Sequence, residues 1–284
     1  MDVGSQAHKE LFCRSFMDSH HVYDPEQLPW PDLNGPDLQR LRAIPFWQEV
    51  LTTERAAGAK VDAYAATVSD PLVREAIVLQ GVEETRHARM LECMIAHYGI
   101  SIGNPAPIDL PSAPERTFID FGYGECVDAF LGFGVFTIAR HAQFLPEAMF
   151  AIFDRLMEEE TRHIVFFVNW VAYLQVHRGR GMQPLRALHA LWYYGRALYR
   201  LGRTVRRGVH HNGEDFSATQ ASVFLEGFNA TTFLSECVKE NVRRMSRFDP
   251  RLLQPRFLPT LTRVALSGVK LLPTWQSHSR RREK

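Results

Sequence analysis

The pentapeptide Glu-Glu-Thr-Arg-His occurs twice in this chain, at residues 83–87 and again at residues 159–163. Each copy holds a glutamate and a histidine three positions apart, Glu84 with His87 and Glu160 with His163. On a helix, residues three apart lie on one face, one above the other. Each copy therefore predicts a carboxylate and an imidazole that point in the same direction from a helix.

Both copies lie within apolar stripes of helical spacing. The two stripes are Val73, Ile77, Gln80, Glu84, His87, Leu91, Met94 and Met149, Phe153, Leu156, Glu160, His163, Phe167, Trp170. This spacing predicts that the four polar side chains of the two pairs face the core. A buried carboxylate needs a partner, so a metal cation is the favoured interpretation, with buried salt bridges as the alternative.

A dimetal site built from two such pairs on facing helices needs a further carboxylate on the helix before each copy. Before the first copy, the candidates are Glu49 and Glu54. The stripe through Glu54 is otherwise apolar, whereas the stripe through Glu49 includes Thr53 and Lys60 and is typical of a solvated face. The periodicity therefore selects Glu54.

The helix before the second copy offers Glu125 and Asp128, which are three residues apart and share a face. Glu125 is preferred, because its longer side chain reaches a central cation more easily. Asp128 remains open as the ligand itself or as an acid behind the ligands. The same segment contains Gly122, Gly124, Gly132 and Gly134, which would leave room for a substrate or let helices approach closely.

The order Glu, Glu-x-x-His, Glu, Glu-x-x-His resembles the ferritin-like superfamily of carboxylate-bridged dimetal proteins, over about residues 46–175. The resemblance implies a four-helix bundle whose metal ligands are Glu54, Glu84, His87, Glu125 (or Asp128), Glu160 and His163. It also implies two Fe ions, with Fe/Mn or Mn/Mn as alternatives, O₂ as co-substrate and an external electron donor. Candidates for groups behind the ligands are Glu83, Glu159, Arg86 and Arg162, although the two arginines could equally be surface residues.

The activity implied by the resemblance is that of a non-haem di-iron oxidase or oxygenase acting on a small organic or carrier-linked substrate. One alternative is a ferritin- or rubrerythrin-like protein that handles iron or peroxide, although no Cys-x-x-Cys pair for a rubredoxin-like centre is present. A second alternative is a helical interaction module with a structural metal. Leu156 occupies the position where some N-oxygenases of the superfamily carry an extra histidine ligand, which argues against that subgroup.

The fold expected from the whole sequence is all-α, with extra helices after the bundle. Residues 1–35 predict an irregular arm, residues 36–178 the bundle, and residues 179–284 additional helices packed on it with a basic tail. The expected helices, after a short one opened by Pro36, span residues 45–68, 71–97, 122–144, 147–177, 184–207, 218–247 and 258–272.

Composition indicates a cytoplasmic protein. Hydrophobic residues make up 45% of the chain, yet no uninterrupted apolar run reaches the length of about 18 residues that a transmembrane helix needs. The N-terminus lacks a signal-peptide core. The four cysteines are scattered without a disulfide pattern, which is typical of a reducing compartment.

The net charge of +1 conceals a basic C-terminal half. Between Arg178 and Gly213 there is no acidic residue but eight arginines, namely Arg178, Arg180, Arg186, Arg196, Arg200, Arg203, Arg206 and Arg207; the tail adds Arg280, Arg281, Arg282 and Lys284. One interpretation is solvated helix faces. The other is a docking surface for an acidic carrier or reductase, a phosphate-bearing substrate or a membrane. No nucleic-acid-binding motif is present, and the extra helices could also form a homodimer surface.

Overall fold

The structure is a computed structural model that describes residues 1–103, 107–210 and 229–271, with the side chains of residues 204–210 and 269–271 left out. Within these ranges it contains nine α-helices, one 3-10 turn (η1, Pro25–Gln27) and no strand. The expected all-α class is therefore confirmed.

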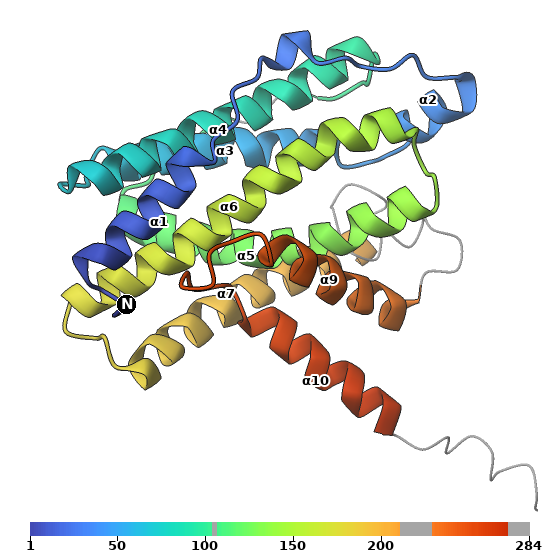
Figure 1. The fold of residues 1–284 in the computed structure, drawn as a ribbon. Helices are drawn as coiled ribbons and strands as arrows, with labels where there is room; N and C mark the ends of the chain where they lie inside the picture. The colour runs from blue at the N-terminus through green and yellow to red at the C-terminus, as the bar shows by residue number, and fades with distance from the viewer. Residues whose placement is uncertain (104–106, 211–228, 272–284) are drawn as a thin grey trace, which may run out of the picture.

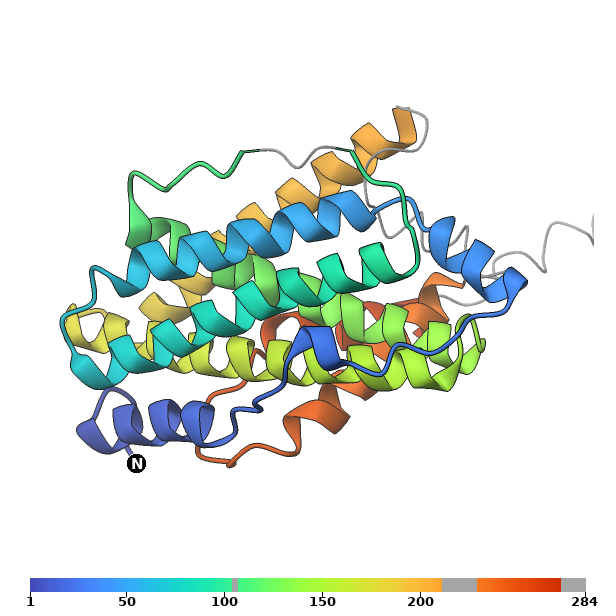
Figure 2. The same cartoon turned by 90° about the horizontal axis from the view of Figure 1, so that it is seen from above.

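Four long helices lie side by side at the centre of the molecule (Figures 1 and 2). They are α3 (Trp47–Ala65), α4 (Pro71–His97), α5 (Pro114–His141) and α6 (Glu147–His177). Asp70 starts α4 by accepting hydrogen bonds from the backbone N–H groups of Leu72 and Val73. Gly99, with a φ of 56°, ends it.

The helices that carry the pentapeptides begin and end where the sequence predicts, at residues 71–97 and 147–177. The helix expected at residues 45–68 is slightly shorter, as α3. The helix expected from residue 122 begins eight residues earlier, at Pro114, which has the fixed φ that suits a first helical turn. This extension is held in place because Phe118 and Ile119 are buried in the core.

The N-terminal segment is not the wholly irregular arm that the sequence predicts for residues 1–35. Residues Gln6–Asp18 form α1, which is capped by Ser5 and packs against α4 and α6. It buries Phe12, Cys13 and Phe16 in the core, and this burial outweighs the polar composition of the segment. The short helix expected from Pro36 is present as α2 (Gly35–Arg42).

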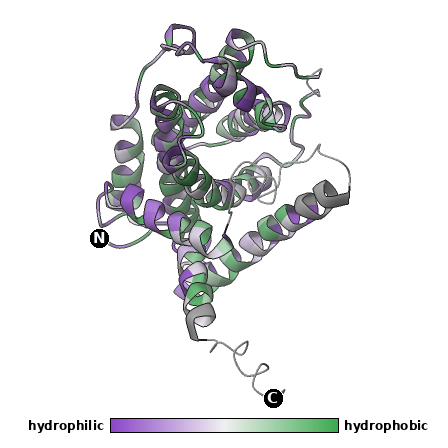
Figure 3. Cartoon of the chain, turned by 90° about the vertical axis from the view of Figure 1, so that its right-hand side faces the viewer, coloured by the Kyte–Doolittle hydropathy of each residue, from purple (hydrophilic) through white to green (hydrophobic). Residues whose placement is uncertain are grey.

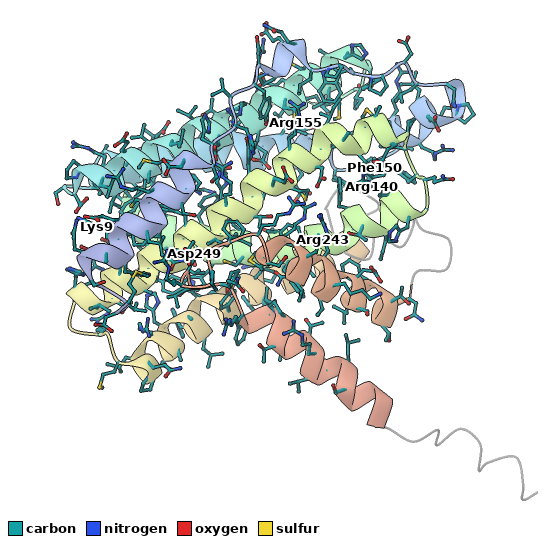
Figure 4. The ribbon with its side chains drawn as sticks, in the orientation of Figure 1. Lys9, Arg140, Phe150, Arg155, Arg243 and Asp249 are labelled. Carbon is teal, nitrogen blue, oxygen red and sulfur yellow. The ribbon has the colours of Figure 1, made fainter. Side chains whose placement is uncertain are left out.

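Polar contacts tie α1 to the rest of the fold. Lys9 on α1, labelled in Figure 4, forms an ion pair with Asp70 at the start of α4. His8 Nε2 lies 3.0 Å from Asn169 Oδ1 on α6. Asn169 Nδ2 in turn donates to the carbonyl of Leu253, so one buried amide connects three segments.

Three further helices follow the central four: α7 (Gln183–His210), α9 (Ala230–Met245) and α10 (Phe257–Leu271). Both α7 and α9 pack on α5. Gly134 permits the close approach of α9, since a Cβ there would lie 2.3 Å from Cys237 Sγ. The helix expected at residues 218–247 is seen only from residue 230, and residues 218–228 lie outside the described residues. So do the basic tail and the side chains of Arg206 and Arg207.

One helix among the described residues, α5, is long and apolar enough to cross a membrane by length and composition. The sequence analysis expected no such segment. Its Phe118 and Phe133 are fully buried, and it carries Glu125 and Asp128. A core helix gives the same signal, so this observation is weak evidence for a membrane span.

Candidate metal centre

Six side chains from the four central helices converge in the interior. They form two overlapping groups, Glu54 with Glu84, His87 and Glu160, and Glu84 with Glu125 and His163. Within each group, one ligand-type atom from every residue lies within 4.8 Å of the others. The structure thus brings together the six residues predicted from the sequence. The residue that α5 contributes is Glu125 rather than Asp128.

Both histidines turn Nδ1 towards the carboxylates. His87 Nδ1 lies 3.1 Å from Glu160 Oε1, and His163 Nδ1 lies 3.1 Å from Glu84 Oε1. Both Nδ1 atoms are buried, and among the described residues neither has a hydrogen-bond partner of acceptable geometry. Glu84 Oε2 is in the same condition. Buried polar atoms are rarely left unpaired, so these three atoms mark a place for a cation.

Two carboxylates lie between the histidines. Glu84 reaches both rings, with Oε1 near His163 and Oε2 3.8 Å from His87 Nδ1. Glu160 does the same in the opposite sense, with Oε2 3.8 Å from His163 Nδ1. Glu54 lies on the His87 side, 3.6 Å from Nδ1. The arrangement suits two cations, each with its own histidine and outer glutamate, that share the two middle carboxylates.

The first glutamate of each pentapeptide holds the histidine of the other copy. His163 Nε2 donates to Glu83 Oε2, and His87 Nε2 donates to Glu159 Oε2, both at 2.8 Å. A carboxylate can only accept here, so the proton is fixed on Nε2. When the ring is neutral, Nδ1 therefore presents a lone pair to the interior, as in histidines that bind metals.

The arginines of the two copies complete this exchange. Arg162 Nη2 donates to Glu83 Oε1, and Arg86 Nη2 donates to Glu159 Oε1, both at 2.6 Å. The Arg86 and Arg162 side chains are only 9% and 6% exposed, so the alternative of surface residues is wrong. Each outer carboxylate is therefore neutralised by an arginine of the opposite copy.

The threonines also have matching roles. Thr85 Oγ1 donates to the Gly81 carbonyl and Thr161 Oγ1 donates to the Met157 carbonyl, in each case one turn earlier on the same helix. All five positions of the pentapeptide thus make equivalent contacts in both copies. This equivalence gives a physical reason why the whole pentapeptide, and not only Glu-x-x-His, occurs twice.

Two residues of the N-terminal segment cover the outer carboxylates, and sequence reasoning missed both. His20 Nδ1 lies 2.5 Å from Glu83 Oε1, and the Tyr23 hydroxyl donates to Glu159 Oε2 at 3.2 Å. The Tyr23 ring also lies 4.2 Å from the Arg86 guanidinium. Both residues fall between helices, where no periodicity relates them to the site, so the sequence carries no signal for these contacts.

The crowding of carboxylates shifts their protonation. Burial, together with the charges of Glu84 and Glu160, raises the pKa of Glu125 well above its usual value. Burial also raises the pKa of Glu54 to about 7, against the opposing effect of His87. Burial opposes ionisation of both histidines, but the surrounding carboxylates raise their pKa well above its usual value. The cluster thus takes up protons where a cation would otherwise compensate its charge.

The centre is closed on one side and accessible on the other. Glu84, His87 and His163 are fully buried, whereas the Glu54 and Glu160 side chains are 16% and 11% exposed. Glu125 is partly exposed as well, so the accessible side lies along α3 and α5.

Asp128 lies one turn beyond Glu125 on α5, and its accessible surface classes it as exposed. Dense surroundings nevertheless raise its pKa to about 6, with a further contribution from the charge of Glu160. Asp128 is not a member of either ligand group. A role as an acid behind the ligands, the other possibility left open for Asp128, stays a prediction.

No family model, curated protein or solved structure matches this chain. Its class is therefore given by its own fold and site: an all-helical protein with a buried Glu/His cluster that could hold metal.

Proposed function

We propose that the chain is a ferritin-like dimetal protein, a non-haem di-iron oxidase or oxygenase that uses O₂ to oxidise a small organic or carrier-linked substrate. The observation that carries this proposal is the pair of unpartnered Nδ1 atoms that face four carboxylates. In a purely structural salt-bridge cluster, the inward nitrogens would have been satisfied as well as the outward ones. Carboxylate oxygen and imidazole nitrogen are ligands that suit Fe²⁺ and Mn²⁺.

Charge balance supports two divalent cations rather than one. The four inner carboxylates carry four negative charges, and two divalent cations would neutralise them if both histidines are neutral. The two outer carboxylates, Glu83 and Glu159, are already compensated by Arg162 and Arg86. With two such cations the whole buried site is neutral, which removes the cost of burying the carboxylates unpaired.

The protein's own residues would hold and tune such a pair. Glu54 and His87 would bind one ion, Glu125 and His163 the other, and Glu84 and Glu160 would lie between them. Two bound irons would supply the capacity to reduce O₂. Glu83 and Glu159 would keep each histidine proton on Nε2, while His20 and Tyr23 cover the closed side. O₂ and substrate would approach from the side of α3 and α5, near Asp128.

Elemental analysis of the purified protein tests the proposal. After anaerobic loading with Fe(II), the wild type is expected to hold about two metal ions per chain. The double variant Glu84→Ala/Glu160→Ala is expected to hold none, whereas Glu75→Ala on the exposed face of α4 should keep both. A well-folded wild type that binds no metal would overturn the proposal.

Exposure of the loaded protein to O₂ separates the oxygenase assignment from its alternatives. An O₂-dependent chromophore and O₂ uptake that needs a reductant support an oxidase or oxygenase. A large cage on size-exclusion chromatography with stored iron would indicate iron handling instead. Metal that is needed for folding, without O₂ uptake, would indicate a structural site.

A further inference from the structure

Helix α7 has two apolar faces, and within the part of the chain that the structure describes only one of them is packed. The packed face includes Tyr194 and Ala197, which are 3% and 5% exposed and lie against the core. The opposite face carries a second apolar stripe at helical spacing whose side chains are 40–68% exposed: Leu185, Leu188, Trp192 and Tyr199, with Leu191 beside it. A surface helix is anchored by one buried apolar stripe, and a second, exposed apolar stripe is typical of a binding surface.

Helix α10 carries exposed apolar side chains of its own. Leu261 and Val264, on one side of α10, are 49% and 65% exposed. The start of α10 contacts the packed face of α7, where the ring of Phe257 stacks on that of Tyr194 with centroids 4.7 Å apart. In Figure 1 both helices lie on the lower side of the molecule, away from α4, and in Figure 3 the lowest helix, which is α10, carries hydrophobic (green) as well as hydrophilic segments.

The charged residues on α7 and α10 themselves are all basic. No acidic residue occurs between residues 178 and 213 or between residues 250 and 282. Arg196 and Arg200 on one flank of α7 pair with Asp120 of α5. Arg180, Arg203 and Arg263 are exposed near the apolar stripes. On these two helices the exposed leucine, tryptophan and tyrosine side chains are thus accompanied by basic residues only, and the neighbouring Asp120 of α5 is paired with Arg196 and Arg200.

We infer that the α7–α10 surface, defined by these exposed apolar side chains and arginines, binds the surface of an anionic lipid bilayer. Amphipathic helices that lie in a membrane interface have this composition, with Trp and Leu entering the bilayer and Arg reaching anionic headgroups. A second copy of the chain fits less well, because a two-fold contact would bring the arginine-rich α7 faces together. An anionic bilayer offers acyl chains to the apolar side chains and negative headgroups to the arginines.

Docking in this way would place the candidate metal centre close to the membrane. Helix α5, which carries Glu125, packs directly against α7, and the rings of Tyr123 and Tyr193 stack between them at 5.3 Å. One helix layer would thus separate the bilayer from the centre. If the proposed function holds, a substrate dissolved in the membrane is the class that this placement favours.

Co-sedimentation with lipid vesicles tests the inference directly. The full chain is expected to sediment with vesicles of phosphatidylcholine and phosphatidylglycerol, and only weakly with phosphatidylcholine alone. Added salt should weaken binding, because it screens the arginines. The variant Leu188→Ser/Trp192→Ser should bind at least about tenfold more weakly, and Arg180→Gln/Arg203→Gln should lose about fivefold per charge.

A matched control uses Val78→Ser/Val82→Ser, which removes two apolar side chains that are 46% and 52% exposed on α4. This variant should bind vesicles like the wild type. Equal binding by all variants, or no preference for anionic lipid, would overturn the inference. So would a lower Tm or the loss of a dimer in Leu188→Ser/Trp192→Ser, since either result would show that protein covers the stripe. Vesicle binding should be the same with and without added Fe(II), so its failure would leave the proposed function untouched.

Discussion

Glu83 Oε2 accepts a 2.8 Å hydrogen bond from His163 Nε2, although the two residues are 80 positions apart and belong to different copies of the pentapeptide. The same relationship joins Glu159 to His87. Each copy thus supplies an inward-facing Glu-x-x-His pair and the outer carboxylate that orients the histidine of the other copy. Loss of either outer glutamate should affect metal binding across the centre.

The first prediction concerns these outer glutamates. Glu83→Gln or Glu159→Gln should weaken Fe(II) or Mn(II) binding about 10- to 100-fold, because the histidine loses its charged acceptor. Competition with a chelator of known affinity measures the change. Glu75→Gln, an exposed substitution on α4, is the control and should leave affinity unchanged. Unchanged affinity in both outer variants would show that these hydrogen bonds do not tune the ligands.

The second prediction separates stability from metal binding at Glu125. In metal-free protein its carboxylate is crowded by other acids, and burial with those charges raises its pKa well above the usual value. Such a group costs stability once pH exceeds its unfolded pKa, because the unfolded state then ionises more readily. Glu125→Gln should therefore raise the Tm of metal-free protein at pH 8, on the order of 2–4 °C.

The same substitution should abolish binding of one of the two metal ions, since Glu125 is the carboxylate that α5 contributes to the His163 group. Calorimetry with and without chelator gives both quantities. A Glu125→Gln variant that is less stable in the metal-free state, or that still binds two ions, would contradict this account of the site.

The third prediction compares two glycines of α5. A Cβ at Gly122 would lie 2.3 Å from the ring of Phe167, so Gly122→Ala should lower the free energy of unfolding by about 1–3 kcal/mol. At Gly132 a Cβ would meet nothing within 4 Å among the described residues. Gly132→Ala should therefore raise stability by up to about 1 kcal/mol, because alanine favours the helix. Denaturant titration of the two variants should give opposite signs.

The fourth prediction concerns Asp70, which caps α4 and pairs with Lys9 of α1. Burial would raise its pKa, but the bond to Lys9 and the backbone N–H groups of α4 lower it below the usual value. The ionised carboxylate therefore contributes stability above its unfolded pKa, and this contribution is lost as pH falls through the folded pKa.

Asp70→Ala should destabilise the protein at pH 7 by about 1 kcal/mol or more, which is the usual effect of losing a helix cap. The difference from wild type should shrink below about pH 4, where the wild-type carboxyl also becomes protonated. Urea unfolding at several pH values measures this. A difference that does not change with pH would show that the charge of Asp70 has no part in the effect.

Much of the site follows from periodicity along single helices. The apolar stripes through Glu84 and Glu160 predict that these residues are buried, and the flanking prolines and glycines predict where their helices begin and end. The same reasoning selects Glu54 over Glu49, and the structure places Glu54 in the cluster. Between Glu125 and Asp128 the stripe gives no decision, since both share a face. The folded structure places Glu125, and not Asp128, in a ligand group, which agrees with the longer side chain of Glu125.

Helix α1 was missed although its segment carries a helical pattern. The segment is short, and its apolar residues Phe12, Cys13, Phe16 and Met17 recur at helical spacing within residues 1–35, which are rich in Pro, Asp and His and were therefore predicted to be irregular. Packing against α4 and α6 stabilises it, in line with the general finding that tertiary contacts supply most helical stability.

The sequence by itself determined the all-helical class, the two central helices that carry the pentapeptides and the residues that could supply a metal site. These properties depend on spacing within one helix, where local geometry relates residues three or four apart. Only the tertiary structure decided that each Glu83 or Glu159 holds the histidine of the other copy, that His20 and Tyr23 cover the closed side, and that α7 keeps an apolar face exposed. Those relationships join residues far apart in the chain, and they exist only once the helices pack against one another.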